Sequence, residues 1–65
     1  MTDGELESLP RGSVLYHVAT GVAGCLLYEG IKLNAGRVWV VRFSTPLGLQ
    51  REEVFAEELT TKQDQ

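Results

Sequence analysis

The sequence contains few of the residues that hold metals or join chain segments covalently. Cys25 is the one cysteine and His17 the one histidine among 65 residues. A lone cysteine cannot form an internal disulfide, and a structural zinc site needs about four cysteine or histidine ligands. We therefore expect neither a disulfide nor a metal ion bound by a single chain.

Long apolar runs are also missing. The longest stretches are interrupted by glycine, histidine or arginine, so none approaches the roughly 20 residues of a membrane-spanning helix. The first residues, MTDGELESLPRGS (1–13), lack the basic start and the apolar centre of a secretory signal. The sequence therefore predicts a soluble, cytoplasmic protein without a membrane partner.

Positive charge is scarce. Nine acidic and six basic residues give a net charge of −3 with histidine neutral. This balance disfavours general binding of nucleic acid or of an anionic membrane surface, because both need an excess of positive charge on the protein. It still permits a local basic patch on one face.

Motifs that carry known chemistry are absent as well. No G-x-x-x-x-G-K-[ST] or G-x-G-x-x-G phosphate loop occurs, and no serine lies in a G-x-S-x-G setting. The clustered Glu52, Glu53, Glu57 and Glu58 are predicted to form a solvated edge, because a catalytic carboxylate pair needs one buried member. We therefore predict no catalytic residue, no cofactor and no metal ligand.

What the sequence does contain is a series of short β-type runs between glycine turns. Its 43% hydrophobic and 23% charged residues are typical of a globular domain. The runs predict an all-β fold with five short strands. A sheet of this size most simply avoids exposed edge strands by curling into a small barrel. The predicted strands are SVLYHV (13–18), VAGCLLYE (22–29), RVWVVRF (37–43), LQREEVF (49–55) and a last short strand after a turn in AEELT (56–60).

The ends of the chain are polar. Residues 1–11 are predicted to form an N-terminal arm, in which Leu6 and Leu9 can dock one helical turn on the body. Residues 12–61 form the barrel, and residues 62–65 form a short C-terminal tail with nothing to bury.

The first three strands carry apolar residues on both faces. With a period of two, the larger side chains share one face and are assigned to the core: Val14, Tyr16, Val18, Val22, Leu26, Tyr28, Trp39, Val41 and Phe43. The opposite face then gathers a second apolar patch, made of Leu15, Cys25, Leu27, Val38 and Val40. A patch of this kind on a small domain predicts an interface with another protein or a second copy. Cys25 is then expected to be buried, either in the packed sheet or under that partner. The alternative is that the N-terminal arm covers the patch.

Two segments resemble the SH3-like small barrels, a superfamily that includes the KOW, Tudor and CAP-Gly modules. VLYHVATGVAGCLLYE (14–29) looks like their first hairpin, and EEVFAEELT (52–60) is similar to their ending in a strand, one tight turn and a final apolar residue. The likeness covers residues 12–61. It implies a five-stranded SH3-like barrel.

The order of glycines and aromatics is most similar to that of CAP-Gly domains. It rests on Gly24, Tyr28, Gly30, Gly36, Trp39, Pro46 and Gly48. LQREE (49–53) replaces the GKNDG peptide-binding loop of that family, so this likeness implies the fold and not the binding of C-terminal tails. A second likeness, to the plasmid-type dihydrofolate reductase, rests on LQRE (49–52) in place of its V-Q-I-Y strand and implies a small enzyme formed at an oligomer axis.

The functional prediction is therefore a non-catalytic interaction module, protein-binding or homo-oligomeric through the apolar face. The alternative is a barrel that binds nucleic acid through Arg37, Arg42 and Arg51 with the neighbouring Tyr28, because basic and aromatic residues interleaved on a barrel hold single strands. A small enzyme formed at an oligomer axis is a third hypothesis.

Overall fold

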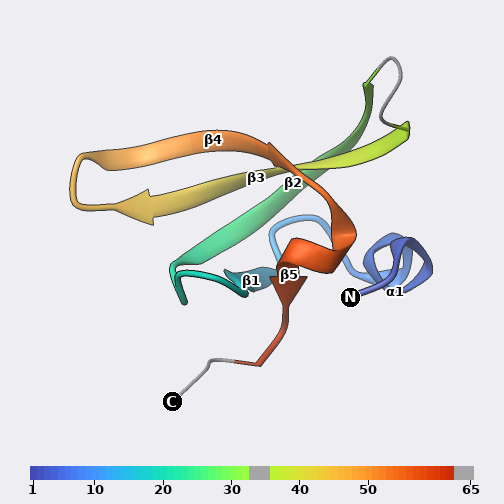
Figure 1. The fold of residues 1–65 in the computed structure, drawn as a ribbon, viewed down its shortest axis with the longest axis horizontal. Helices are drawn as coiled ribbons and strands as arrows, with labels where there is room; N and C mark the ends of the chain where they lie inside the picture. The colour runs from blue at the N-terminus through green and yellow to red at the C-terminus, as the bar shows by residue number, and fades with distance from the viewer. Residues whose placement is uncertain (33–35, 63–65) are drawn as a thin grey trace.

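The described strands form one antiparallel sheet with the order β4-β3-β2-β1-β5, which confirms the predicted all-β fold of five strands. The structure is a computed structural model that describes residues 1–32 and 36–62 (Figure 1); residues 63–65 of the predicted tail lie outside the described residues. Its elements are α1 (Asp3–Ser8), β1 (Val14–His17), β2 (Ala23–Lys32), β3 (Gly36–Thr45), β4 (Gly48–Val54), the 3-10 turn η1 (Ala56–Glu58) and β5 (Leu59–Thr60).

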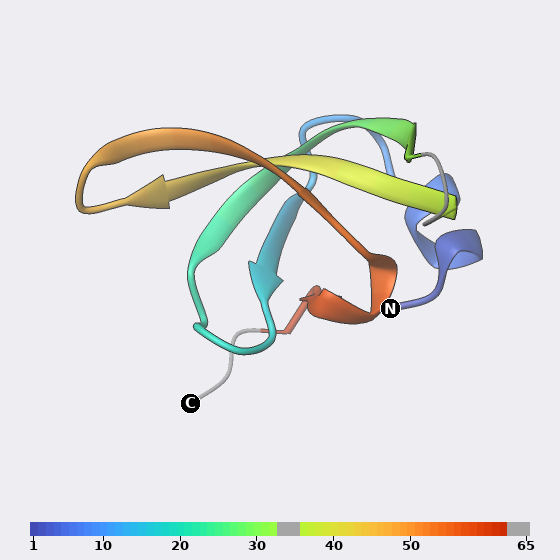
Figure 2. The same cartoon turned by 45° about the horizontal axis from the view of Figure 1, so that its top comes forward.

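The sheet is strongly twisted and curved, and β4 and β5 are its two edges (Figure 2). β2 and β3 are longer than the sequence predicts, because their ladder continues through the pair Gly30 and Val38 to the pair Lys32 and Gly36. The hairpin of β3 and β4 extends past the rest of the sheet, on the left in Figure 1. The chain turns there at Pro46 and Leu47.

A bulge in β2 decides which side chains face the core. Leu26 pairs with Val41, and Tyr28 pairs with Val40, so Leu27 is an extra residue in the ladder. An extra residue reverses the alternation of faces along a strand. Leu26 therefore points into the core, whereas Tyr28 points to the outer face of the sheet.

The core lies on the inner, concave face. Its buried members are Leu6, Leu15, Leu26, Trp39, Val41, Phe43, Val54, Ala56 and Leu59. The predictions for Leu26, Trp39, Val41 and Phe43 are confirmed.

The prediction that Val14, Tyr16 and Val18 of the first strand point into the core is wrong. Leu15 is fully buried, whereas Val14 and Val18 are 55% and 53% exposed. Leu15 pairs with Gly24, which in turn pairs with the inward-facing Phe43, so the register places the odd-numbered residues of β1 inside.

Gly24 allows two strands to approach closely beside the core. A Cβ atom at this position would lie 2.8 Å from Val41 Cγ1 and 2.9 Å from both the Arg42 carbonyl oxygen and Phe43 Cδ1. A backbone oxygen cannot move aside without disturbing the ladder. Glycine is therefore required here for steric reasons.

The N-terminal segment completes the core. α1 begins with a capping box, in which Thr2 Oγ1 accepts a hydrogen bond from the Glu5 amide (3.2 Å) and Thr2 N donates to Glu5 Oε1 (2.8 Å). These hydrogen bonds lower the pKa of Glu5. Leu6 is fully buried in the core, and Leu9 packs against it. The arm thus lies on the inner face and does not cover the outer one.

We expect Leu6→Ala to lower the free energy of unfolding by about 2 to 5 kcal/mol, because it leaves a cavity in the core. Leu47→Ala is the matched control: Leu47 is 87% exposed, so the same substitution should change stability by less than about 0.5 kcal/mol. Urea unfolding measures both. Equal midpoints would show that α1 is not part of the cooperative core.

Gly24→Ala should destabilise the protein by about 1 to 3 kcal/mol, the usual cost of overpacking. Gly30→Ala, on the same strand, is its control, because a Cβ there would meet Val38 Cγ2 at an ordinary 3.5 Å. Thermal unfolding of the two variants makes the comparison. A Gly24→Ala protein as stable as Gly30→Ala would contradict the close approach of β2 and β3.

Candidate functional site

A row of exposed side chains crosses four segments on the outer face of the sheet. Val14 pairs with Cys25, Cys25 with Arg42, and Arg42 with Arg51. All four residues are exposed. The register therefore places two arginines on neighbouring strands, directly opposite each other, with a thiol beside them.

An aromatic side chain adjoins this row. Arg51 Nη1 lies 3.4 Å from the hydroxyl oxygen of Tyr28, to which it donates a hydrogen bond. Tyr28 is 45% exposed because the bulge at Leu27 turns it outward, above Val40. Its ring is accessible beside a guanidinium group.

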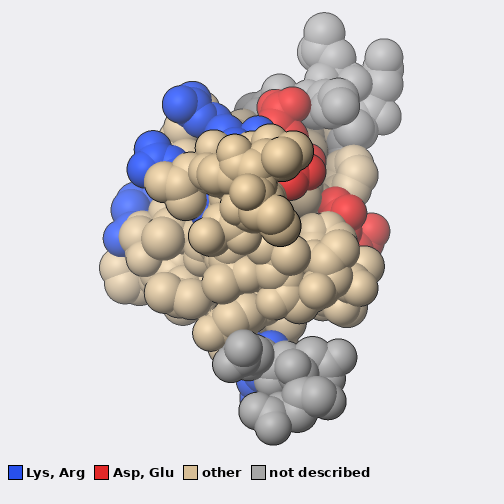
Figure 3. All heavy atoms as spheres, turned by 90° about the vertical axis from the view of Figure 1, so that its left-hand side faces the viewer, with Lys and Arg blue, Asp and Glu red and all other residues tan. Residues whose placement is uncertain are grey.

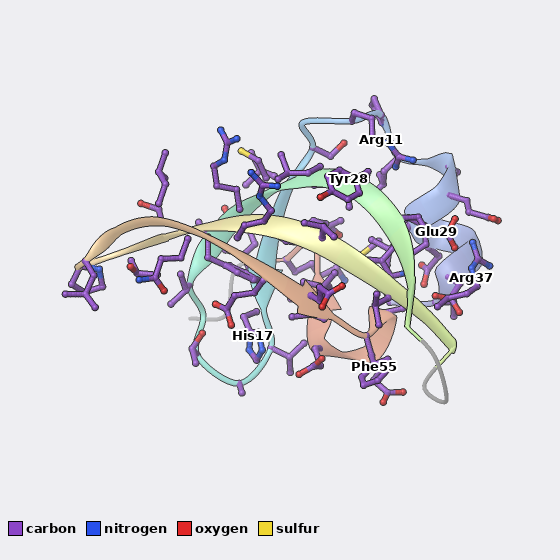
Figure 4. The ribbon with its side chains drawn as sticks, turned by 90° about the horizontal axis from the view of Figure 1, so that it is seen from above. Arg11, His17, Tyr28, Glu29, Arg37 and Phe55 are labelled. Carbon is purple, nitrogen blue, oxygen red and sulfur yellow. The ribbon has the colours of Figure 1, made fainter. Side chains whose placement is uncertain are left out.

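A third arginine comes from the segment between α1 and β1. Gly12 N donates to the Leu26 carbonyl over 2.7 Å, which holds the preceding Arg11 beside β2. Figure 4 shows Arg11 and Tyr28 along one side of the molecule, with His17 and Phe55 along the opposite side. We call the surface formed by Arg11, Cys25, Tyr28, Arg42 and Arg51 the outer basic face.

The three arginines of the outer basic face form no ion pair within the described ranges 1–32 and 36–62. Glu53 also lies on the outer face, paired with Val40, but it is not within ion-pair distance of them. Like charges directly opposite each other destabilise a sheet. The Arg42–Arg51 pair is therefore an unfavourable arrangement that a bound anion would relieve.

On one face of the molecule, most of the visible basic and acidic atoms lie on different sides. Figure 3 shows most of the visible lysine and arginine atoms along one side, a few more at the lower end of the view, and the visible acidic atoms along the other side. A chain whose net charge is −3 thus presents a local basic face.

Arg37, which the sequence groups with Arg42 and Arg51, lies elsewhere. Its Nη2 is 2.5 Å from Glu7 Oε1 of α1, its Nε donates to Glu29, and its guanidinium carbon lies 5.5 Å from the centroid of the Trp39 ring. The hydrogen bonds to Glu29 and Glu7 raise the pKa of Arg37. Arg37 therefore fastens α1 to the inner side of the sheet and is not part of the outer basic face.

The predicted apolar patch does not form as a surface. Leu15 is in the core, and Val38 and Val40, although on the outer face, are only 2% and 5% exposed. Leu27 is half-buried at the bulge, and Cys25 is exposed in the single chain, which contradicts its predicted burial in the packed sheet. Val38 and Val40 are already shielded within a single chain, so little of the patch is left for a partner.

Cys25 and His17 lie on opposite faces, because Cys25 pairs with Val14 while His17 alternates with it along β1. They cannot act as a nucleophile and its base. Within the described part of the chain, no three His, Cys, Asp or Glu side chains are placed to hold a metal ion. No helix there is long and apolar enough to cross a membrane.

Sequence reasoning missed Arg11, because it treated residues 1–11 as an arm apart from the sheet. The signal that could have located it is the pair Pro10 and Gly12, which turns the chain immediately before β1. Comparisons with protein-family models, with curated proteins and with solved structures find no match to this chain.

We expect Cys25 in the native protein to react with a thiol reagent about as fast as in the denatured protein, because its side chain is exposed. Absorbance after mixing with the reagent gives both rates, and Cys25→Ser is the blank. Strong native protection at every protein concentration would show that the outer face is covered.

Proposed function

We propose that this protein is a non-catalytic, SH3-like binding module whose outer basic face holds single-stranded nucleic acid. The observation that carries the proposal is the direct opposition of Arg42 and Arg51 without a carboxylate partner in the described structure. Neighbouring strands lie about 4.8 Å apart, so both guanidinium groups can reach the oxygens of one phosphate. Arginine is well suited to this contact because its planar fork of donors matches phosphate geometry.

Tyr28 favours a nucleic acid over other anions. An exposed aromatic ring beside phosphate-binding arginines allows a base to stack while the adjacent phosphate is held. Stacking requires an unpaired base, so a single strand fits this surface better than a duplex. Arg11, which the Gly12–Leu26 hydrogen bond holds beside β2, adds a third positive charge.

The SH3-like assignment is part of the proposal. It is supported by the meander β2-β3-β4, by the pairing of β1 with both β2 and β5, and by the 3-10 turn η1 before the last strand. The cytoplasm is the proposed location, because a lone exposed thiol such as Cys25 persists in a reducing compartment. The protein-binding and oligomeric readings lose support because their apolar patch is mostly buried.

Arg42→Gln should weaken binding of a labelled single-stranded oligonucleotide of about 12 nucleotides and reduce the salt slope of log K by about 0.7. Arg51→Lys should keep that slope, since it keeps the charge. Fluorescence anisotropy at several salt concentrations measures these values. Lys62→Gln is the control, because it removes one positive charge beyond β5, away from this face.

Tyr28→Ala should cost about 1 to 3 kcal/mol of binding free energy with little change in the salt slope, whereas Tyr28→Phe should retain most of the affinity through its ring. The proposal fails if the wild-type protein does not bind the oligonucleotide, or if Lys62→Gln weakens binding as much as Arg42→Gln does.

A further inference from the structure

A second concave site lies on the inner side of the sheet, between the turn that joins β1 to β2 and the projecting hairpin of β3 and β4. It has a volume of about 290 Å³. Ligand pockets for whole small molecules usually measure about 300 to 1,000 Å³. This pocket is therefore of a size that suits one side chain of a larger partner.

Apolar groups form much of its wall. Val22, Phe43 and Pro46 line it, and the His17 and Phe43 rings meet edge to face with their centroids 5.8 Å apart. These surfaces suit the methylene stem of a long side chain, because contact with them removes apolar area from water.

Most polar groups of the lining are already engaged within the chain. His17 Nδ1 accepts from the Ala19 amide (3.1 Å), Thr20 Oγ1 accepts from the Val22 amide (3.3 Å), and Thr45 Oγ1 donates to the Gly48 carbonyl (2.8 Å). Because His17 Nδ1 is an acceptor, its Nε2 carries the proton and faces Glu58 Oε1 at 3.7 Å.

Glu52 is different. It lines the pocket, and its carboxylate makes no hydrogen bond or ion pair with any residue in 1–32 or 36–62. Together with Glu58 behind His17, it makes the electrostatic potential of the pocket negative. An occupant that complements this site has an apolar stem and a cationic end.

A larger hollow of about 540 Å³ near Phe55 is a weaker candidate. Two of its charged lining residues are occupied, because Asp3 accepts the Trp39 Nε1 hydrogen bond and Arg37 pairs with Glu7 and Glu29. They belong to the docking of α1.

We propose that the pocket between His17, Phe43 and Glu52 takes a lysine or arginine side chain from a protein partner. The site lies on the inner side of the sheet and is independent of the outer basic face. A module with both surfaces can hold an anionic strand on one side and a basic protein segment on the other.

The test is an NMR titration of the ¹⁵N-labelled full chain with short blocked glycine-serine peptides that contain one lysine, one arginine or one norleucine. The lysine and arginine peptides should shift the amide signals of Thr20, Val22 and Thr45. Norleucine, which has the stem without the charge, should bind about two- to fivefold more weakly, because Glu52 is exposed and solvent screens an exposed ion pair.

Glu52→Gln should weaken binding of the basic peptides about two- to fivefold for the same reason. Glu53→Gln is the matched control: it makes the same change one residue along β4, on the opposite face, and should leave the affinity unchanged. Arg42→Gln should also have no effect, which separates this site from the nucleic-acid face.

Three outcomes would overturn the proposal. The norleucine peptide could bind as well as the lysine peptide, or Glu52→Gln and Glu53→Gln could lose affinity equally. Self-association of the wild-type chain that Glu52→Gln abolishes would show that the occupant is a second copy and not a different protein.

Discussion

The docking of α1 on Trp39 is the contact on which the rest of the structure depends. The Trp39 indole is fully buried at the inner face, where its Nε1 donates to Asp3 over 2.8 Å, and the Arg37 guanidinium lies over its ring. A buried indole N–H without a partner would be costly. The same helix inserts Leu6 into the core. A sheet this small, with β4 and β5 as free edges, thus obtains a closed core from a six-residue helix.

The bulge at Leu27 has a comparable influence on the outer face. By reversing the alternation of β2, it turns Leu26 inward and Tyr28 outward, opposite Val40. Without the extra residue, Tyr28 would point to the core side and Arg51 would have no aromatic neighbour. One irregularity in a ladder therefore completes the core and also assembles the candidate binding surface.

The two candidate sites differ in charge for a structural reason. The register of β3 and β4 pairs Arg42 with Arg51, so both side chains lie on the outer face. Glu52, the next residue, pairs with Val41 and therefore points inward. A hairpin that carries Arg51, Glu52 and Glu53 in succession presents its charges alternately to the two faces. The alternation directs Glu52 to the inner pocket and both Arg51 and Glu53 to the outer face, where the arginines outnumber this one carboxylate.

Much of the fold followed from the sequence alone, because β-branched and aromatic runs between glycine turns indicate where the strands lie, although β2 and β3 extend beyond their predicted bounds. The positions of all five strands, and the inward facing of Trp39, Val41 and Phe43, were predictable for this reason. The facing of β1 was not, since Val14 and Leu15 are both apolar and only the register with Gly24 chooses between them. Nor was the separation of Arg37 from Arg42, because Glu29 reaches Arg37 through the pairing of β2 with β3, and Glu7 reaches it only after α1 docks. The outer basic face and the pocket at Glu52 depend on a bulge, a register and a long-range contact, and these arise from tertiary packing rather than from local pattern.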